Sequence, residues 1–156
     1  MNMATETIKP AGAIQVELEI TINAPREEVW KAFVEESNAW WHKDFYVSKR
    51  PAKFVIEPKL GGRMFEDCGD GTGFTWFTIL GIEPNESLYV TGHIRPPYGG
   101  PCTTLIWFSL ENKGKDKTVL KISDTTHGHV SEAMAESMDS GWKMLFNELK
   151  ALAEKR

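Results

Sequence analysis

The sequence predicts an α+β fold in which one strand, two short helices and six further strands precede one long C-terminal helix. Residues 14–22 alternate apolar and polar side chains without a fault, which is typical of a half-buried strand. Residues 45–127 repeat short β patterns between turn residues, and the C-terminal part repeats apolar residues at spacings of three and four. Strands and helices segregated in this way along a chain indicate the α+β class.

Composition narrows the class of protein. A chain of 156 residues with 41% apolar and 26% charged residues is typical of one globular domain and argues against disorder. The net charge of −4, without a basic stripe, argues against a nucleic-acid partner. No apolar run approaches the roughly 20 residues of a membrane span. The first residues lack a signal-peptide pattern, so we expect a cytoplasmic protein with no membrane partner.

The N-terminal part contains the first strand and two short helices. Residues 1–12 have no periodicity and predict a flexible tail ahead of a single domain over residues 13–156. Pro25 suits a first helical position, and apolar residues at helical spacing predict a helix over 25–36. A second short helical turn, which contains Trp41, follows from Ser37.

The remaining strands are predicted over residues 53–57, 63–68, 74–82, 87–94, 103–111 and 118–125. Asp70 and Gly71 predict a hairpin turn, and the proline-rich residues 95–101 predict a loop. Ser131 is a plausible cap for the long helix. Its apolar stripe consists of Met134, Met138, Trp142, Leu145, Leu149 and Leu152.

This order resembles the START-like, or SRPBCC, helix-grip superfamily, in particular the group related to the activator of the ninety-kilodalton heat-shock-protein ATPase. The resemblance covers about residues 14–153 and is carried by Ala24–Trp30, Pro58–Arg63, Ile82–Leu88 and the helix around Gly141 and Trp142. It implies a seven-stranded antiparallel sheet curved around the C-terminal helix. It also implies an apolar cavity between them, which some members use for cyclase or hydratase chemistry, whereas the activator itself binds a chaperone.

Motifs for catalysis or metal binding are weak. His42, His93, His127 and His129, with Asp124, lack the usual zinc spacings, so we expect no metal and no other cofactor. The glycines of residues 69–73 lack the ending of a phosphate loop, and Cys68 and Cys102 are expected to be free structural thiols. Glu57, Glu66 and Asp67 could supply an acid pair only if they face inward. We therefore assign no catalytic residue.

A ligand pocket is the leading functional prediction. Strict alternation groups Phe74, Trp76, Leu80 and Ile82 on the inward face of one strand, and Phe108 is inward on another. We expect a non-enzymatic protein that binds a small apolar or aromatic ligand, with the alternatives of a cyclase or hydratase in the same cavity or a chaperone-interacting module. The predicted ligand-binding residues are Trp41, Trp76, Phe108, Met134, Met138, Trp142 and Leu145. Gly141 leaves space either for a ligand or for close packing.

The same alternation predicts an apolar cluster on the outward face of the sheet, formed by Phe77, Ile79, Tyr89, Leu105 and Trp107. A two-fold homodimer through this cluster is one expectation. Coverage of the cluster by strand twist or by the loop of residues 95–101 is the other.

Overall fold

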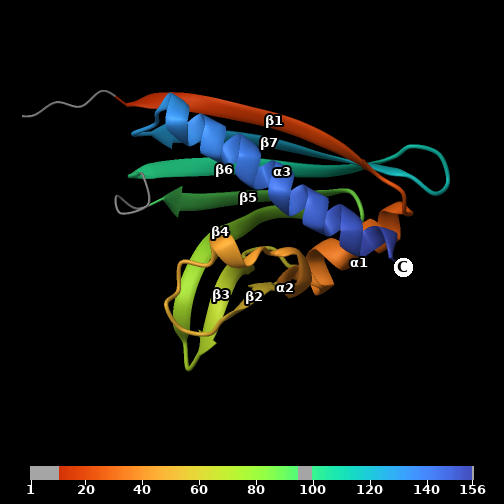
Figure 1. The fold of residues 1–156 in the computed structure, drawn as a ribbon, viewed down its shortest axis with the longest axis horizontal. Coiled ribbons are helices and arrows are strands. Elements are labelled where there is room, and N and C mark those ends of the chain that lie inside the picture. Colours follow the sequence, from red (N-terminus) through yellow and green to blue (C-terminus); the bar gives the residue numbers. More distant parts are fainter. Residues whose placement is uncertain (1–10, 95–99, 156) are drawn as a thin grey trace, which may run out of the picture.

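An antiparallel sheet of seven strands, in the order β1-β7-β6-β5-β4-β3-β2, forms the framework of the computed structural model (Figure 1). The structure describes residues 11–94 and 100–155. The strands are β1 (Gly12–Ile22), β2 (Lys53–Ile56), β3 (Arg63–Gly69), β4 (Thr72–Glu83), β5 (Ser87–Ile94), β6 (Cys102–Asn112) and β7 (Thr118–Gly128). The helices are α1 (Arg26–Glu35), α2 (Ser37–Trp40) and α3 (Glu132–Glu154), with a 3₁₀ turn η1 (Lys43–Phe45).

The α+β class and the predicted order of elements are confirmed, and η1 is an addition to them. Most of the predicted tail, residues 1–10, lies outside the described residues, as do residues 95–99 of the predicted loop. The first strand begins at Gly12, two residues before its alternating pattern starts. Among the helices in the described part of the chain, none is long and apolar enough to cross a membrane.

Helix α3 crosses one face of the sheet, and the strands curve around it (Figure 1). Ser131 caps this helix as predicted, because its hydroxyl accepts a hydrogen bond from the backbone N–H of Met134 at 3.2 Å. The face of α3 that meets the sheet buries Trp142, Leu145, Phe146, Leu149 and Ala153. The strands supply the opposite side of this core with Leu88, Val90, Ile106, Phe108, Leu110, Leu120 and Ile122. The core therefore lies between the inward face of the sheet and α3.

The turn between β3 and β4 has the predicted geometry. Asp70 and Gly71 have positive φ angles of 52° and 74°, as a two-residue hairpin turn of this type requires. Gly69 pairs with Thr72 across it. The glycines of this segment therefore make a turn and leave no helix start that could bind a phosphate.

The outward placement of Phe77 and Ile79 was wrong. Met64 pairs with Phe77 whereas Phe65 pairs with Thr75, so β4 has one extra residue, Trp76, at this point. Such a bulge inverts the alternation, because the residues after it exchange faces. Phe77 and Ile79 are consequently buried in the core, 6% and 1% exposed.

A second bulge occurs where Ile79 pairs with Val90 and Gly81 pairs with Tyr89, which leaves Leu80 as the extra residue. Leu80, expected to face inward, is 45% exposed. Tyr89 and Trp107 do lie together on the outward face, with ring centroids 5.4 Å apart, and Trp107 is 48% exposed. The predicted outward cluster thus loses two of its five members to the core.

Candidate functional site

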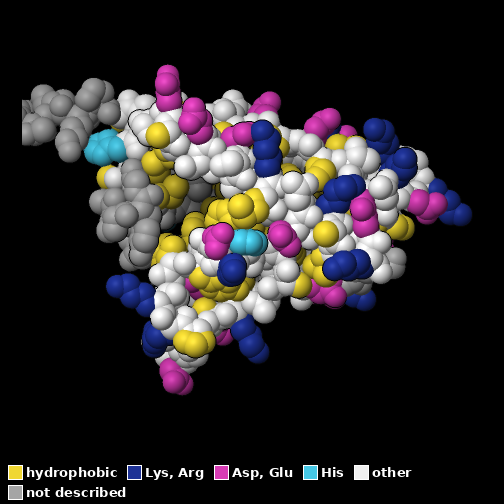
Figure 2. Space-filling view, viewed as in Figure 1, with side chains coloured by type: hydrophobic (Ala, Val, Ile, Leu, Met, Phe, Trp, Pro, Cys, Tyr) yellow, Lys and Arg dark blue, Asp and Glu magenta, His cyan; other side chains and the backbone are white. Residues whose placement is uncertain are grey.

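A cavity of about 320 Å³ lies between the inward face of the sheet and the N-terminal half of α3. Six aromatic side chains contribute to its walls: Trp41, Phe45, Phe74, Trp76, Phe77 and Trp142. Figure 2 shows hydrophobic side chains gathered on this face of the molecule between α3 and η1. A volume near 300 Å³ is at the lower end for a small-molecule site.

Six of the seven residues predicted to bind a ligand line this cavity, namely Trp41, Trp76, Met134, Met138, Trp142 and Leu145. Phe108 does not line it. That side chain is fully buried behind Trp142, with ring centroids 5.5 Å apart, and it also contacts Phe33 of α1. Strand alternation gave the correct face for Phe108 but could not show that Trp142 lies in front of it.

Three lining residues were missed because their position depends on long-range packing. Phe77 reaches the cavity through the bulge in β4, and its ring passes over Gly92 of β5. A Cβ on Gly92 would lie 2.7 Å from this ring, so only glycine leaves the necessary space. Phe45 and Val47 come from the irregular segment after α2, which has no periodicity from which to predict a face.

The aromatic wall is held in a fixed arrangement by ring contacts. Trp41 stacks on Phe54 of β2 with centroids 3.9 Å apart and planes 4° from parallel. Its edge also meets Trp76 at 5.2 Å, and Phe74 meets Trp76 at 5.3 Å. Offset and edge-to-face pairs of this kind stabilise a defined ring orientation. The walls on the η1 side therefore consist of mutually supported rings.

Glu66 holds this aromatic wall in place through hydrogen bonds. Its carboxylate accepts hydrogen bonds from the backbone N–H groups of Val47 and Ser48 at about 3.0 Å and from Nε1 of Trp76 at 2.8 Å. The side chain is fully buried, as the acid-pair alternative required, but it does not line the cavity. Because all its bonds are to N–H donors of the chain, we interpret Glu66 as a positioning residue for Val47 and Trp76.

The other two acids of that alternative lie at the surface. Glu57 bonds Arg63 at 2.8 Å, and this contact holds the pKa of Glu57 below its usual range. Asp67 is exposed and accepts a bond from the backbone N–H of Gly69. The three carboxylates therefore form no inward acid pair.

The polar corner of the cavity, as we define it, consists of Asp124, Thr104, Thr126 and Trp142. Oδ1 of Asp124 accepts hydrogen bonds from the hydroxyl groups of Thr104 at 2.5 Å and Thr126 at 3.1 Å, and Oδ2 accepts one from Nε1 of Trp142 at 2.9 Å. All four residues line the cavity, and Asp124 is only 3% exposed. Burial raises the pKa of the Asp124 carboxyl, while these three donors partly oppose that rise.

Asp124 was considered from the sequence only as a metal ligand. Its inward orientation was nevertheless readable, because it continues the alternation of Leu120 and Ile122 along β7, which pairs with β6 without a register shift. No lysine or arginine is among the residues that line the cavity in the described part of the chain. The carboxylate therefore has no cationic partner there.

Trp41 adds an unusual donor beside the cavity. The side chain is 4% exposed, and its buried Nε1 has no hydrogen-bond partner among the described residues. An unpaired buried donor costs about 1–3 kcal/mol, so such groups are rare unless something else binds them. A ligand with an acceptor atom would remove this cost.

Gly141 combines the two roles that the sequence left open. It lines the cavity, and a Cβ built on it would lie 3.2 Å from Cε1 of Phe45. The absent side chain therefore lets the η1 ring approach α3 closely. Close packing and cavity lining coincide at this position.

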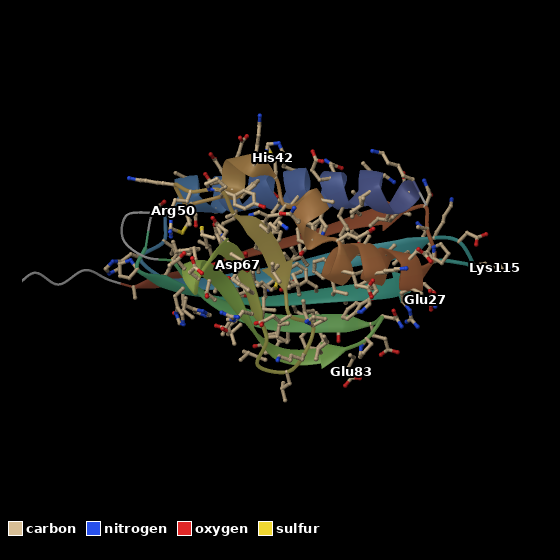
Figure 3. The ribbon with its side chains drawn as sticks, turned by 90° about the horizontal axis from the view of Figure 1, so that it is seen from below. Glu27, His42, Arg50, Asp67, Glu83 and Lys115 are labelled. Carbon is tan, nitrogen blue, oxygen red and sulfur yellow. The ribbon has the colours of Figure 1, made fainter. Side chains whose placement is uncertain are left out.

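The histidines do not come together with acids or cysteines into a metal site. In residues 11–94 and 100–155, no group of three or more His, Cys, Asp or Glu side chains could hold an ion. His42, on the α3 side of the sheet (Figure 3), caps η1 by accepting a bond from the N–H of Asp44 at 3.2 Å. His93 lies 3.2 Å from the hydroxyl of Thr103. Cys68 and Cys102 are free thiols, as predicted.

Comparison with known proteins agrees with this fold. The family model described as activator of Hsp90 ATPase homolog 1-like protein matches residues 23–154. Mll3558 from Rhizobium loti is similar in structure with a TM-score of 0.70 and 17% identity, over 92% of this chain and 99% of that one. CalU16 from Micromonospora echinospora is similar with a TM-score of 0.64 and 20% identity, over 92% of this chain and 83% of that one.

EF2215 from Enterococcus faecalis gives a TM-score of 0.66 and 17% identity, over 91% of this chain and 72% of that one. At these identities, the likeness shows the fold alone. No curated protein matches the chain.

Proposed function

The chain belongs to the activator of Hsp90 ATPase homolog 1-like family, with a START-type fold, and on this premise we propose that it binds a small apolar or aromatic molecule between the sheet and α3 without converting it. The observation that carries the proposal is the aromatic-walled cavity of about 320 Å³. The core of a protein of this size normally fills such a space with its own side chains, because protein interiors are close-packed. An apolar cavity with a few convergent polar groups is the usual form of a small-molecule site.

The lining residues support an adaptable site. Met134 and Met138 are half-buried and form the α3 wall, and methionine side chains adjust to ligands of different shape because they are unbranched and polarisable. Trp41 and Trp142 close two other sides with large apolar surfaces. Apolar contact therefore supplies most of the expected affinity, and the polar corner fixes orientation.

A cyclase or hydratase in the same cavity is the second candidate, and one observation favours it. Asp124 is a buried carboxyl with a raised pKa beside the cavity, which is a common setting for an acid or base in catalysis. Its three hydrogen bonds, and the lack of a second carboxyl among the described lining residues, favour binding over proton transfer. Conversion of a co-purified ligand by the protein would support the enzyme instead.

The first test is isothermal titration of the protein with naphthalenemethanol, a neutral aromatic probe, using two methionine variants. Met138→Trp places a larger ring inside the cavity, whereas Met144→Trp makes the same change on the exposed side of α3, where Met144 is 41% exposed. We expect the wild type and Met144→Trp to bind alike, and Met138→Trp to bind at least about tenfold more weakly, because overfilling removes the space for the probe. Equal affinity in all three proteins would contradict the proposal.

Native mass spectrometry of protein purified from its own host is the second test. A co-purified small molecule would be retained by the wild type and lost from Met138→Trp. Release of the molecule from both proteins to the same extent would mean that it binds outside the cavity.

A further inference from the structure

Asp124 is the carboxylate that lines the cavity. A carboxylate has about four positions for accepted hydrogen bonds, and Asp124 uses three of them, two on Oδ1 and one on Oδ2. Among residues 11–94 and 100–155, no donor occupies the second position on Oδ2. The residue lines the cavity, so a bound molecule can reach it.

Among the described residues, no lysine or arginine pairs with the charge of Asp124. Its three donors, Thr104, Thr126 and Trp142, are all neutral, and the described lining contains no lysine or arginine. A buried charge without a partner is costly, and the raised pKa of Asp124 reflects this burial. A cationic group on a ligand would provide the missing partner.

The walls near this corner suit the same kind of ligand. Trp142 donates its N–H to Asp124, while its ring packs against Phe77 with centroids 6.3 Å apart. Trp76 also contacts Phe77, at 6.2 Å. The faces of indole and phenyl rings attract cations, and this attraction strengthens when water is excluded. The carboxylate and the ring faces therefore both attract a positively charged group of a ligand.

Other head groups fit less well. A neutral hydroxyl could donate to the free position on Oδ2, but it would leave the charge of Asp124 uncompensated. A carboxylate or phosphate would be repelled by Asp124. The small volume, about 320 Å³, limits the apolar part to a body of about one or two rings.

We propose that the natural ligand is a small apolar amine whose protonated nitrogen pairs with the carboxylate of Asp124 while its apolar body contacts the aromatic walls. This inference rests on the proposed binding function and specifies the chemical class of the ligand. The ammonium fills the free acceptor position of Oδ2, and the rings of Trp142 and Phe77 flank the same corner.

Three probes with one apolar body and different head groups test this inference. Naphthylmethylamine is a cation at neutral pH, naphthalenemethanol is neutral, and naphthoic acid is an anion. Each is titrated calorimetrically into the wild type, Asp124→Asn and Asp116→Asn. Asp116 lies exposed in the β6–β7 hairpin, so its variant makes the same change of net charge away from the cavity.

The wild type should bind the amine at least about tenfold more tightly than the alcohol, because a charge-assisted hydrogen bond adds to the same apolar contact. It should bind the acid most weakly of the three probes. Asp124→Asn should lose this preference. Its affinity for the amine should fall about tenfold or more, whereas its affinity for the alcohol should change less than about threefold. Asp116→Asn should behave as the wild type.

The outcomes separate this inference from the proposed function. If the alcohol binds in the cavity but the amine binds no more tightly, or if Asp124→Asn keeps the amine preference, the amine inference is overturned and the binding function stands. If Asp116→Asn lowers the preference as much as Asp124→Asn, general attraction to an acidic protein explains it and the inference also fails. If none of the three probes binds, both the inference and the proposed function fail.

Discussion

Replacement of Asp124 by asparagine and by alanine should have different effects on stability, because the two variants separate the hydrogen bonds of the side chain from its charge. Asparagine can still accept a bond from Nε1 of Trp142, and its amide can donate to the hydroxyl oxygens of Thr104 and Thr126. It carries no charge, so it avoids the desolvation that raises the pKa of Asp124. Alanine keeps none of these partners.

The expected magnitudes follow from these contacts. In Asp124→Ala, the indole N–H of Trp142, a residue only 7% exposed, loses its acceptor, and an unpaired buried donor costs about 1–3 kcal/mol. The two threonine hydroxyls lose partners as well, so we expect a loss of at least about 2 kcal/mol in the free energy of unfolding. Asp124→Asn should stay within about 1 kcal/mol of the wild type or exceed it.

The pH dependence has a definite sign. The pKa of Asp124 in the folded protein is raised above its ordinary value of 3.8, so the folded state binds this proton more tightly than the unfolded chain. The stabilisation from this group is fully present below pH 3.8 and is lost as the pH rises through the folded pKa. The Asn variant has no such loss, so its stability relative to the wild type should increase with pH across this window and then stay constant.

Other titratable groups near the corner do not obscure this difference. His93 lines the cavity, and Cys102 on β6 has its pKa raised by burial and, to a smaller extent, by Asp124. Both are present in the wild type and in the variant. The difference between the two proteins therefore isolates position 124, apart from the weak coupling to Cys102.

Urea unfolding at 25 °C, followed by far-UV circular dichroism between pH 3.5 and 7.5, measures these quantities, and equal m-values would show that the unfolded states are comparable. If Asp124→Asn loses as much stability at neutral pH as Asp124→Ala, the negative charge itself stabilises the fold and our assignment of desolvation as the dominant cause is refuted. A stability of Asp124→Asn that falls relative to that of the wild type as the pH rises would refute it equally.

Three further predictions follow from other parts of the structure. Phe77→Ala should cost about 3–5 kcal/mol in urea unfolding because Phe77 is a core residue, whereas Trp107→Ala should cost less than about 1 kcal/mol; similar losses would contradict the bulge assignment. Gly141→Ala should raise the unfolding free energy by up to about 1 kcal/mol, since alanine favours the helix and the half-buried Phe45 ring can yield slightly; a clear loss would mean that the ring is fixed. The homodimer stays a prediction for light scattering at tens of micromolar, with a dimeric wild type and a monomeric Trp107→Lys expected; monomers in both would exclude it.

Much of the fold was predictable because its signals are local. The alternation of residues 14–22, the turn at Asp70 and Gly71 and the cap at Ser131 each act over a few residues, and all three are present in the structure. The α3 stripe likewise supplied four of the six predicted residues that line the cavity, since helical spacing fixes which side chains share a face.

The errors arise where the conformation of a residue depends on a distant partner. The extra residue at Trp76 is defined by the pairing of β4 with β3, and the extra residue at Leu80 by the pairing of β4 with β5. Gly81 directly follows the extra residue Leu80 in the second bulge. No glycine or proline marks the bulge at Trp76 itself. One clue existed in β5, where Gly92 provides the space that the ring of Phe77 needs. From a single sequence, that glycine could equally have marked a bulge of its own.

The bulge at Trp76 and the regular pairing of β7 together explain how the strands supply the cavity with both aromatic rings and a carboxylate. Strict alternation would direct only every second residue of β4 inward, but the extra residue lets Phe74, Trp76 and Phe77 all reach the cavity. On β7, the register is unbroken, so Asp124 occupies an ordinary inward position beneath Trp142. The apolar shape of the site therefore depends on the irregular strand β4, whereas its charge depends on the regular strand β7. A substitution on one of these strands can change one property while the other strand keeps its register.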